Sequence, residues 1–68
     1  MNVAPLVSIL VGRITEIGKG HLVIGAGTRV ALPPGQTFKG LVVGANVSIR
    51  AVRERGQYVA ETITAEGG

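Results

Sequence analysis

The chain of 68 residues is long enough for one small domain and too short for two, and a domain near this size buries only about 60% of its unfolded surface. Apolar residues make up 46% and charged residues 16%, which excludes a disordered tail, and the lack of cysteine excludes disulfides and thiolate metal sites. The net charge of +3 favours anionic partners only weakly, because soluble domains commonly carry such a charge.

The N-terminal segment is apolar over residues 3–11, with one serine. Pro5 interrupts it, and it is much shorter than the roughly 20 residues of a membrane-spanning helix. No Lys or Arg precedes it and no small-residue cleavage pattern follows it before Gly12, so it does not resemble an export signal. We therefore expect a leader over residues 1–6, a first strand from Val7 and no membrane span.

Glycine and proline clusters divide the rest of the chain into short β-rich segments. We expect five strands, over residues 7–17, 21–24, 28–32, 46–54 and 57–65. They form a single domain over residues 7–65, followed by a frayed end over 66–68. A long helix is not expected, because the segment 33–45 is too rich in glycine and proline.

The first strand changes its hydrophobic phase at Gly12. Val7, Ile9 and Val11 alternate on one parity, and Ile14 follows on the other. A phase change at glycine predicts a β-bulge and a bent strand. Such a strand belongs to both halves of a closing barrel and removes sheet edges, so Gly12 is expected to be architectural.

Three-residue hairpin loops are expected at 18–20, 25–27 and 54–56, because each ends on a glycine that can adopt the left-handed conformation. This register predicts an inner face of Ile14, Leu22, Ile24, Val30, Leu32, Val47, Ile49, Ala51, Val59 and Ile63. It predicts an outer face of Arg13, Thr15, Ile17, His21, Val23, Arg29, Ala31, Ser48, Arg50, Val52, Tyr58, Ala60 and Thr62. Glu61 does not fit, because this register turns it inward.

The last hairpin also allows a two-residue loop of Arg55 and the glycine after it. Glu61 would then face Arg50 as an ion pair, and Tyr58 would face Arg53 as a cation–π pair. That loop requires a positive φ at Arg55, which is unfavourable for a residue with a Cβ. We therefore prefer the three-residue loop.

The chain offers few groups for catalysis. It has no Asp or Cys, one histidine and four scattered glutamates, and a barrel of this size provides no cleft for a Ser-His-acid arrangement. His21 lies beside a predicted turn with no expected carboxylate neighbour, so it is a poor base or metal ligand. We expect a protein that is not an enzyme and that has no metal and no small-molecule cofactor.

One set of residues forms a candidate binding surface for nucleic acid or for a partner protein. Its members are Arg13, Lys19, His21 and Arg29 on one outer face, with Arg50 and Tyr58 on the last hairpin. Guanidinium groups spaced across a twisted sheet could follow a phosphate backbone. The competing interpretation is a solvated face whose apolar strip pairs with another subunit, and the positive mean hydropathy of +0.41 favours it.

Two segments carry a resemblance to a known fold. The start Gly12-Arg13-Ile14-Thr15-x-Ile17 and the turn Leu41-x-Val43-Gly44-x-x-Val47-x-Ile49 look like those of small bacterial OB-fold-like barrel domains. These domains include many of uncharacterised function and the ribosome-associated S1-like type. The resemblance implies an all-β, five-stranded OB-like barrel, and an SH3-like barrel would show the same features. Nucleic-acid-binding members carry stacking aromatic residues where this chain has Val23, Arg29 and Ala31.

The expected function is that of a non-catalytic binding module. Protein association, with a protein partner or as a homo-oligomer, is the favoured prediction. The alternative is single-stranded nucleic-acid binding through Arg13, Lys19, His21 and Arg29 on a basic sheet face.

Overall fold

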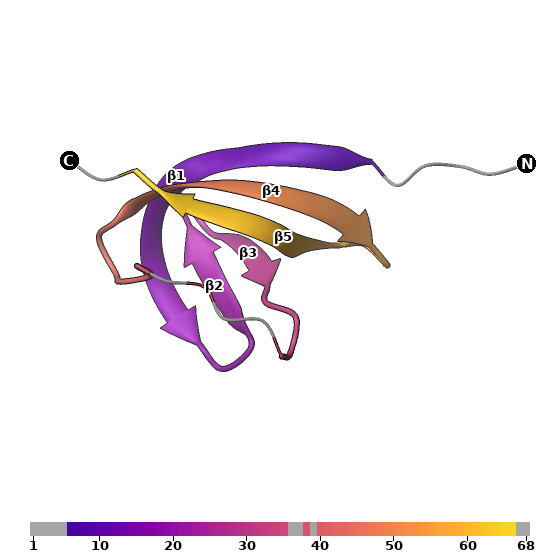
Figure 1. Cartoon of the computed structure of the whole chain (residues 1–68), viewed down its shortest axis with the longest axis horizontal. Helices are drawn as coiled ribbons and strands as arrows, with labels where there is room; N and C mark the ends of the chain where they lie inside the picture. Colours follow the sequence, from indigo (N-terminus) through magenta and orange to yellow (C-terminus); the bar gives the residue numbers. More distant parts are fainter. Residues whose placement is uncertain (1–5, 36–37, 39, 67–68) are drawn as a thin grey trace, which may run out of the picture.

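The computed structural model of the chain describes residues 6–35, 38 and 40–66, which contain five β-strands and no helix. The strands are β1 (Val7–Gly18), β2 (His21–Ile24), β3 (Thr28–Ala31), β4 (Asn46–Glu54) and β5 (Gln57–Ala65) (Figure 1). The prediction of an all-β chain with five strands is confirmed, and every expected bound agrees within one residue. Of the expected leader and frayed end, residues 1–5 and 67–68 lie outside the described residues.

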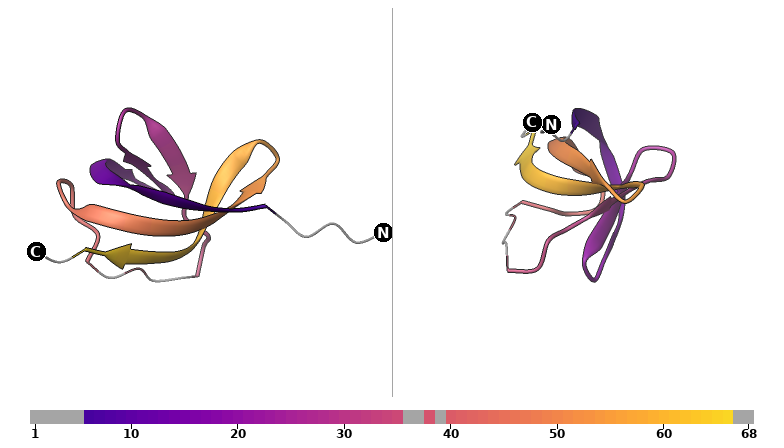
Figure 2. Two further views of the ribbon diagram at one scale, coloured as in Figure 1. Left: turned by 90° about the horizontal axis from the view of Figure 1, so that it is seen from above. Right: turned by 90° about the vertical axis from the view of Figure 1, so that its right-hand side faces the viewer.

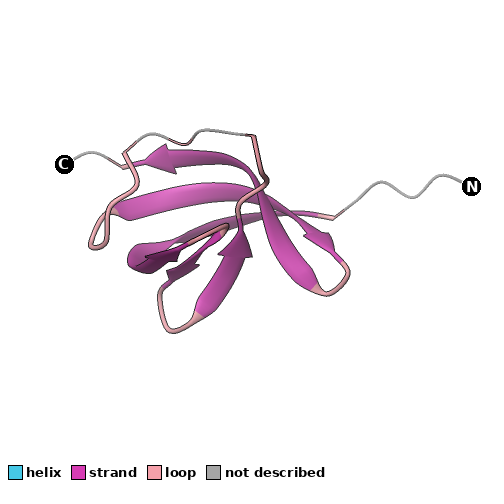
Figure 3. Cartoon of the chain, turned by 90° about the horizontal axis from the view of Figure 1, so that it is seen from below, coloured by secondary structure: helices cyan, strands magenta, loops and turns pink. Residues whose placement is uncertain are grey.

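The strands form a closed ring in the order β1-β2-β3-β5-β4 (Figure 2). Neighbours are antiparallel except β3 and β5, which are parallel. β1 is bent, as predicted: residues 7–13 pair with β4, and residues 14–18 pair with β2. In Figure 3 the described residues form strands, loops and turns, and within these residues no helix is long and apolar enough to span a membrane.

The core lies inside the ring and consists of aliphatic side chains from all five strands. Its buried members are Ile14, Leu22, Ile24, Val30, Val47, Ile49, Ala51 and Ala60, with Leu10, Leu32, Phe38, Leu41, Tyr58 and Ile63 packed against them. Burying one Val, Leu or Ile side chain contributes about 1.5–3 kcal/mol, so this one cluster supplies most of the stabilisation. The inner face predicted from alternation is confirmed except at β5, whose register differs.

The bulge in β1 lies at Thr15, and the prediction of a bulge at Gly12 is wrong. Ile14 pairs with Ile24 and Glu16 pairs with Val23, so Thr15 is the extra residue. The even-numbered residues 8–14 all lie on the inner side of β1, with no change of phase at Gly12. The odd-numbered apolar residues of β1 therefore point outward along its whole first half.

The first hairpin has a two-residue loop instead of the expected three. Gly18 pairs with His21, and Gly20 takes the left-handed conformation with a φ of 75°. This shortening pairs Ile17 with Leu22, whose side chain is buried, whereas the sequence pattern placed Ile17 on the outer face. At this end of β1 the Ile17 side chain is nevertheless 39% exposed. The second hairpin has the expected loop over residues 25–27, because the strands separate after Ile24 and rejoin at Thr28.

The last hairpin adopts the register that was not preferred. Its loop has two residues, with φ of 51° at Arg55 and 80° at Gly56, the pattern of a type I′ turn. This turn matches the right-handed twist of the flanking strands, which offsets the strain at Arg55.

A bulge in β5 follows from this register and places Glu61 outside the regular pairing. Ala51 pairs with Ala60 and Arg50 with Thr62, so Glu61 is the extra residue. Ala60 is therefore buried, although it was expected on the outer face. Two further corrections come from the same shift: Tyr58 points to the core side and Val59 to the outer side.

Candidate interaction surface

A row of apolar side chains is exposed on the outer side of β1. Val7, Ile9 and Val11 are 44%, 61% and 66% exposed, and we call these three residues the β1 strip. They are outward because β1 alternates and its even-numbered side chains fill the inside of the ring. An unbroken row of large β-branched residues on a solvent face is unusual, since antiparallel sheets normally place polar residues there.

The β1 strip borders outward residues of β4 and β5. The cross-strand neighbours are Val52 and Val59 beside Val7, Arg50 and Thr62 beside Ile9, and Ser48 and Thr64 beside Val11. Val52 is only 6% exposed, whereas the residues beside Ile9 and Val11 are polar or charged. The outer face of this sheet is therefore apolar along β1 and more polar along β4 and β5.

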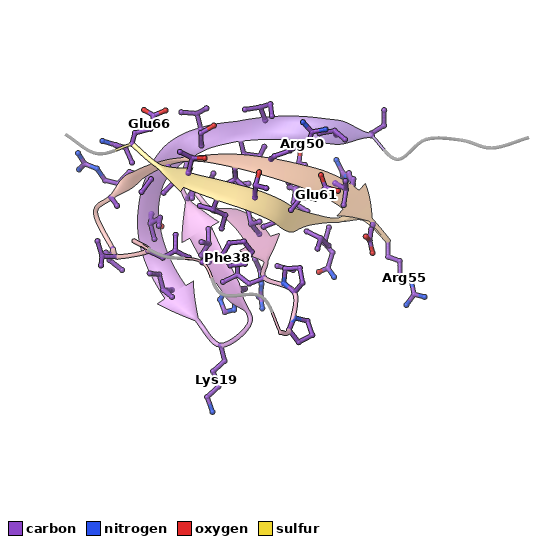
Figure 4. The ribbon with its side chains drawn as sticks, in the orientation of Figure 1. Lys19, Phe38, Arg50, Arg55, Glu61 and Glu66 are labelled. Carbon is purple, nitrogen blue, oxygen red and sulfur yellow. The ribbon has the colours of Figure 1, made fainter. Side chains whose placement is uncertain are left out.

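One ion pair lies on this outer face. Nε of Arg50 donates to Oε1 of Glu61 at 3.3 Å, and Figure 4 shows the two side chains close together on β4 and β5. The β5 bulge places Glu61 within reach of Arg50. An exposed pair of this kind contributes only about 0–1 kcal/mol, but it neutralises the guanidinium next to the strip.

The candidate binding residues lie in two places, four on β1, the β1–β2 turn, β2 and β3, and two on β4 and β5. Arg13, Lys19 and Arg29 are exposed, as predicted. Lys19 extends from the tip of the β1–β2 turn, far from Arg50 on β4 (Figure 4). Glu16, opposite Val23 on the outer side of the sheet, adds a negative charge to the face that was expected to be basic.

His21 is held against its own hairpin. Its Nε2 lies 3.4 Å from Oε2 of Glu16, and its Nδ1 lies 3.4 Å from the carbonyl oxygen of Lys19. The imidazole also covers Gly18, where an added Cβ would overlap it. The expectation that His21 has no carboxylate neighbour is therefore wrong, because the shortened loop and the Thr15 bulge turn Glu16 to the same side.

Tyr58 is not a free stacking surface. Its side chain is half-buried against the core, and the Cζ atom of Arg53 lies 5.4 Å from the centroid of its ring. This is the cation–π pair of the two-residue-loop register. One side of the aromatic ring is thus taken up by a neighbour in the same chain.

An open apolar groove lies beside the β3–β4 connection. Its lining consists of Gly20, Leu32, Pro33, Pro34, Gly35, Phe38 and Leu41. None of these side chains can transfer a proton, act as a nucleophile or ligate a metal. Elsewhere in the described ranges, no three His, Cys, Asp or Glu side chains lie close enough together to hold a metal ion.

The exposure of the β1 strip was not predicted from the sequence, because apolar residues at every second position are typical of a strand that faces the core. Parity carried a signal that could have found it. Ile14 is a core residue, and counting back by twos reaches Gly12 and Leu10, not Val11 and Ile9. A bulge at Gly12 was needed to turn the strip inward, and no such bulge exists.

Comparison of the chain with protein-family models, with curated proteins and with solved structures found no match in any of the three.

Proposed function

We propose that the chain is a small OB-like barrel that acts as a non-catalytic binding module and associates with further copies of itself. The observation that carries the proposal is the exposure of the three side chains of the β1 strip. Removing apolar surface from water is favourable by roughly 25 cal/mol per Å², and association is the simplest way for a folded chain to do so. Closed homo-oligomers are the commonest assemblies of soluble proteins.

The strand arrangement supports the OB-like type. The OB-fold is a five-stranded Greek-key barrel, and here five strands close in an order that departs from the sequence order between β3 and β4. The first strand pairs with two partners through its two halves, as the resemblance implies. A module of this type binds through its surface, because its interior is filled by the core.

The distribution of chemical groups supports binding over catalysis. The apolar groove has no ionisable lining, and His21 faces Glu16 and a backbone carbonyl without a hydroxyl nucleophile among its hydrogen-bond partners. Catalytic sites combine such groups in one concave pocket. On the described surface, the groove and the ionisable pair of His21 and Glu16 are separate.

Nucleic-acid binding through Arg13, Lys19 and Arg29 is the second candidate, and the exposure of these three side chains is what favours it. Against it stand the carboxylate of Glu16 on that face and the engagement of Tyr58 with Arg53. A salt titration separates the two functions. A phosphate binder loses affinity for an oligonucleotide steeply as salt rises, whereas apolar self-association changes little.

Sedimentation equilibrium at several protein concentrations tests the proposal. We expect the average mass to rise with concentration for the unchanged chain and to stay at one subunit for Ile9→Lys, which places a charge in the strip. Val42→Lys is the matched control, because Val42 is 60% exposed and lies outside the strip. A chain that remains a monomer at all concentrations, or that associates equally well with Ile9→Lys, contradicts the proposal.

A further inference from the structure

The first half of β1 has an open backbone edge. Ile14 exchanges hydrogen bonds with the connection before β4, donating to Ala45 and accepting from Gly44, whereas the carbonyl of Arg13 accepts from Gly25 after β2. Even-numbered residues of β1 therefore direct their N–H and C=O groups toward β4, and odd-numbered residues direct theirs to the opposite side. The carbonyl of Leu6, which accepts from Arg53 of β4, follows the same rule.

No strand of the described chain covers that opposite side before residue 14. β2 has four residues and pairs with β1 only from Ile14 onward. The N–H and C=O groups of Val7, Ile9 and Val11 therefore face an edge without a paired strand. These are the same three residues whose side chains form the β1 strip, so unpaired backbone and exposed apolar surface coincide.

This edge lacks the features that usually prevent strand pairing. Natural edge strands are protected by charged side chains, by proline, by a bulge or by short length. Residues 7–12 contain no charge and no proline, and the bulge lies beyond them at Thr15. The one charged neighbour of Ile9 on β4, Arg50, is paired with Glu61.

Building on the self-association proposed above, we propose that two copies join by antiparallel pairing of their β1 edges about a two-fold axis at Ile9. Val7 then faces Val11 of the second copy, Ile9 faces its own equivalent, and Val11 faces Val7 of the second copy. Each of these pairs exchanges two N–H···O=C bonds. Every outward pair consists of β-branched residues, which pack well across strands.

The sequence favours this register over its neighbours. Side chains of the two strips share one face only if the register shifts in steps of two residues. A shift of two in one direction would place Val7 opposite Arg13 of the second copy, and the other shift would place Val11 opposite Pro5. Only the pairing centred on Ile9 matches all three apolar residues and uses all three sets of free backbone groups.

Single-cysteine variants test the pairing, because the chain contains no cysteine of its own. A hydrogen-bonded antiparallel pair has Cα atoms about 5.5 Å apart, within the range that a disulfide spans. Under mild oxidation, a mixture of Val7→Cys and Val11→Cys should form the mixed disulfide at least about tenfold faster than either variant alone forms its own. Ile9→Cys should cross-link to itself, and Val42→Cys, similarly exposed, should not.

Amide hydrogen exchange provides a backbone readout on the unmodified chain. We expect the amides of Ile9 and Val11 to become protected as the protein concentration rises, while the amide of Leu10, which faces β4, is protected throughout. Association in sedimentation without preferential cross-linking of the Val7→Cys and Val11→Cys mixture would overturn the β1 pairing and leave self-association standing. A chain that is monomeric at every concentration would overturn both.

Discussion

The positive φ at Arg55 leads to a prediction about stability. The Arg55–Gly56 loop is a type I′ turn, in which the first central residue must adopt the left-handed conformation. For a residue with a Cβ this conformation is unfavourable by roughly 1–2 kcal/mol, and Asn tolerates it far better. Arg55 is exposed and takes part in none of the side-chain hydrogen bonds or ion pairs of the described residues. Arg55→Asn should therefore remove strain without removing a contact, raising the free energy of unfolding by about 0.5–1 kcal/mol.

Thermal unfolding followed by circular dichroism measures this change. In a domain of this size, 1 kcal/mol shifts Tm by roughly 4–8 °C, so Arg55→Asn should raise Tm by about 2–8 °C. The matched control is Arg55→Ala, which removes the same charge and the same long side chain but lacks the short polar side chain that lets Asn adopt the left-handed conformation. All variants are compared at one protein concentration, because the proposed self-association would make Tm concentration-dependent.

Equal stability of Arg55→Asn and Arg55→Ala would refute the reasoning. It would mean that the chain does not hold Arg55 at positive φ, and the two-residue loop would then be wrong. The register of β4 with β5 would have to shift with it, so the pairing of Arg50 with Glu61 and of Arg53 with Tyr58 would also be lost. The measurement thus tests the hairpin as a whole through one exposed residue.

The remaining stability predictions concern the core and two glycines. Ile49→Ala should lower the free energy of unfolding by about 2–5 kcal/mol in urea denaturation, because its side chain is fully buried, and near-parental stability would contradict its place in the core. Gly12→Ala should change stability by less than about 0.5 kcal/mol, since its added Cβ would meet its nearest neighbour at 3.5 Å, an ordinary contact. Gly18→Ala should be destabilising by up to about 1 kcal/mol, more than Gly12→Ala, because its Cβ overlaps the end of the His21 imidazole, which must turn away and lose its contacts with Glu16 and Lys19, and adding His21→Ala should remove that difference. Equal effects of the two glycine substitutions would contradict this packing.

The strands were predictable because glycine punctuation marks where each one ends. Glycine pairs at 18 and 20 and at 25 and 27, and the single Gly56, interrupt β-branched runs, and the alternation within each run identified Ile14, Leu22 and Val30 as inner residues. Burial enforces this alternation, since a one-residue slip would expose the core. The information needed to place the strands and their inner residues was therefore local.

The registers were harder to predict because loop length and bulges compensate for each other. In the first hairpin the loop is one residue shorter than expected, and the extra residue Thr15 restores the pairing of Ile14 with Ile24. In the last hairpin Glu61 takes the same role for Ile49 and Ile63. In the last hairpin the two registers share Ile49 and Ile63 in the core but exchange Val59 and Ala60 between the inner and the outer face, and the sequence pattern alone does not distinguish them.

The candidate surface lies on the outer face, so it was predicted only in part. Arg13, Lys19 and Arg29 are exposed as expected, because charged side chains mark the solvent side in any register. Tyr58 was assigned to the wrong side, since its position depends on the hairpin register. The β1 strip was missed because apolar residues at alternating positions normally indicate a core.

The unequal lengths of the strands explain why a closed ring still has an exposed edge. Closure removes an edge only where a strand has a partner on both sides. β1 has 12 residues and β2 has four. Residues 7–13 of β1 therefore extend beyond β2 and have a partner strand, β4, on one side only. That overhang is where apolar outward side chains and free backbone groups coincide. If two copies pair through this overhang as proposed, a polar residue at position 9 should give a monomer with the same core, so Ile9 is the position at which association can be tested separately from folding.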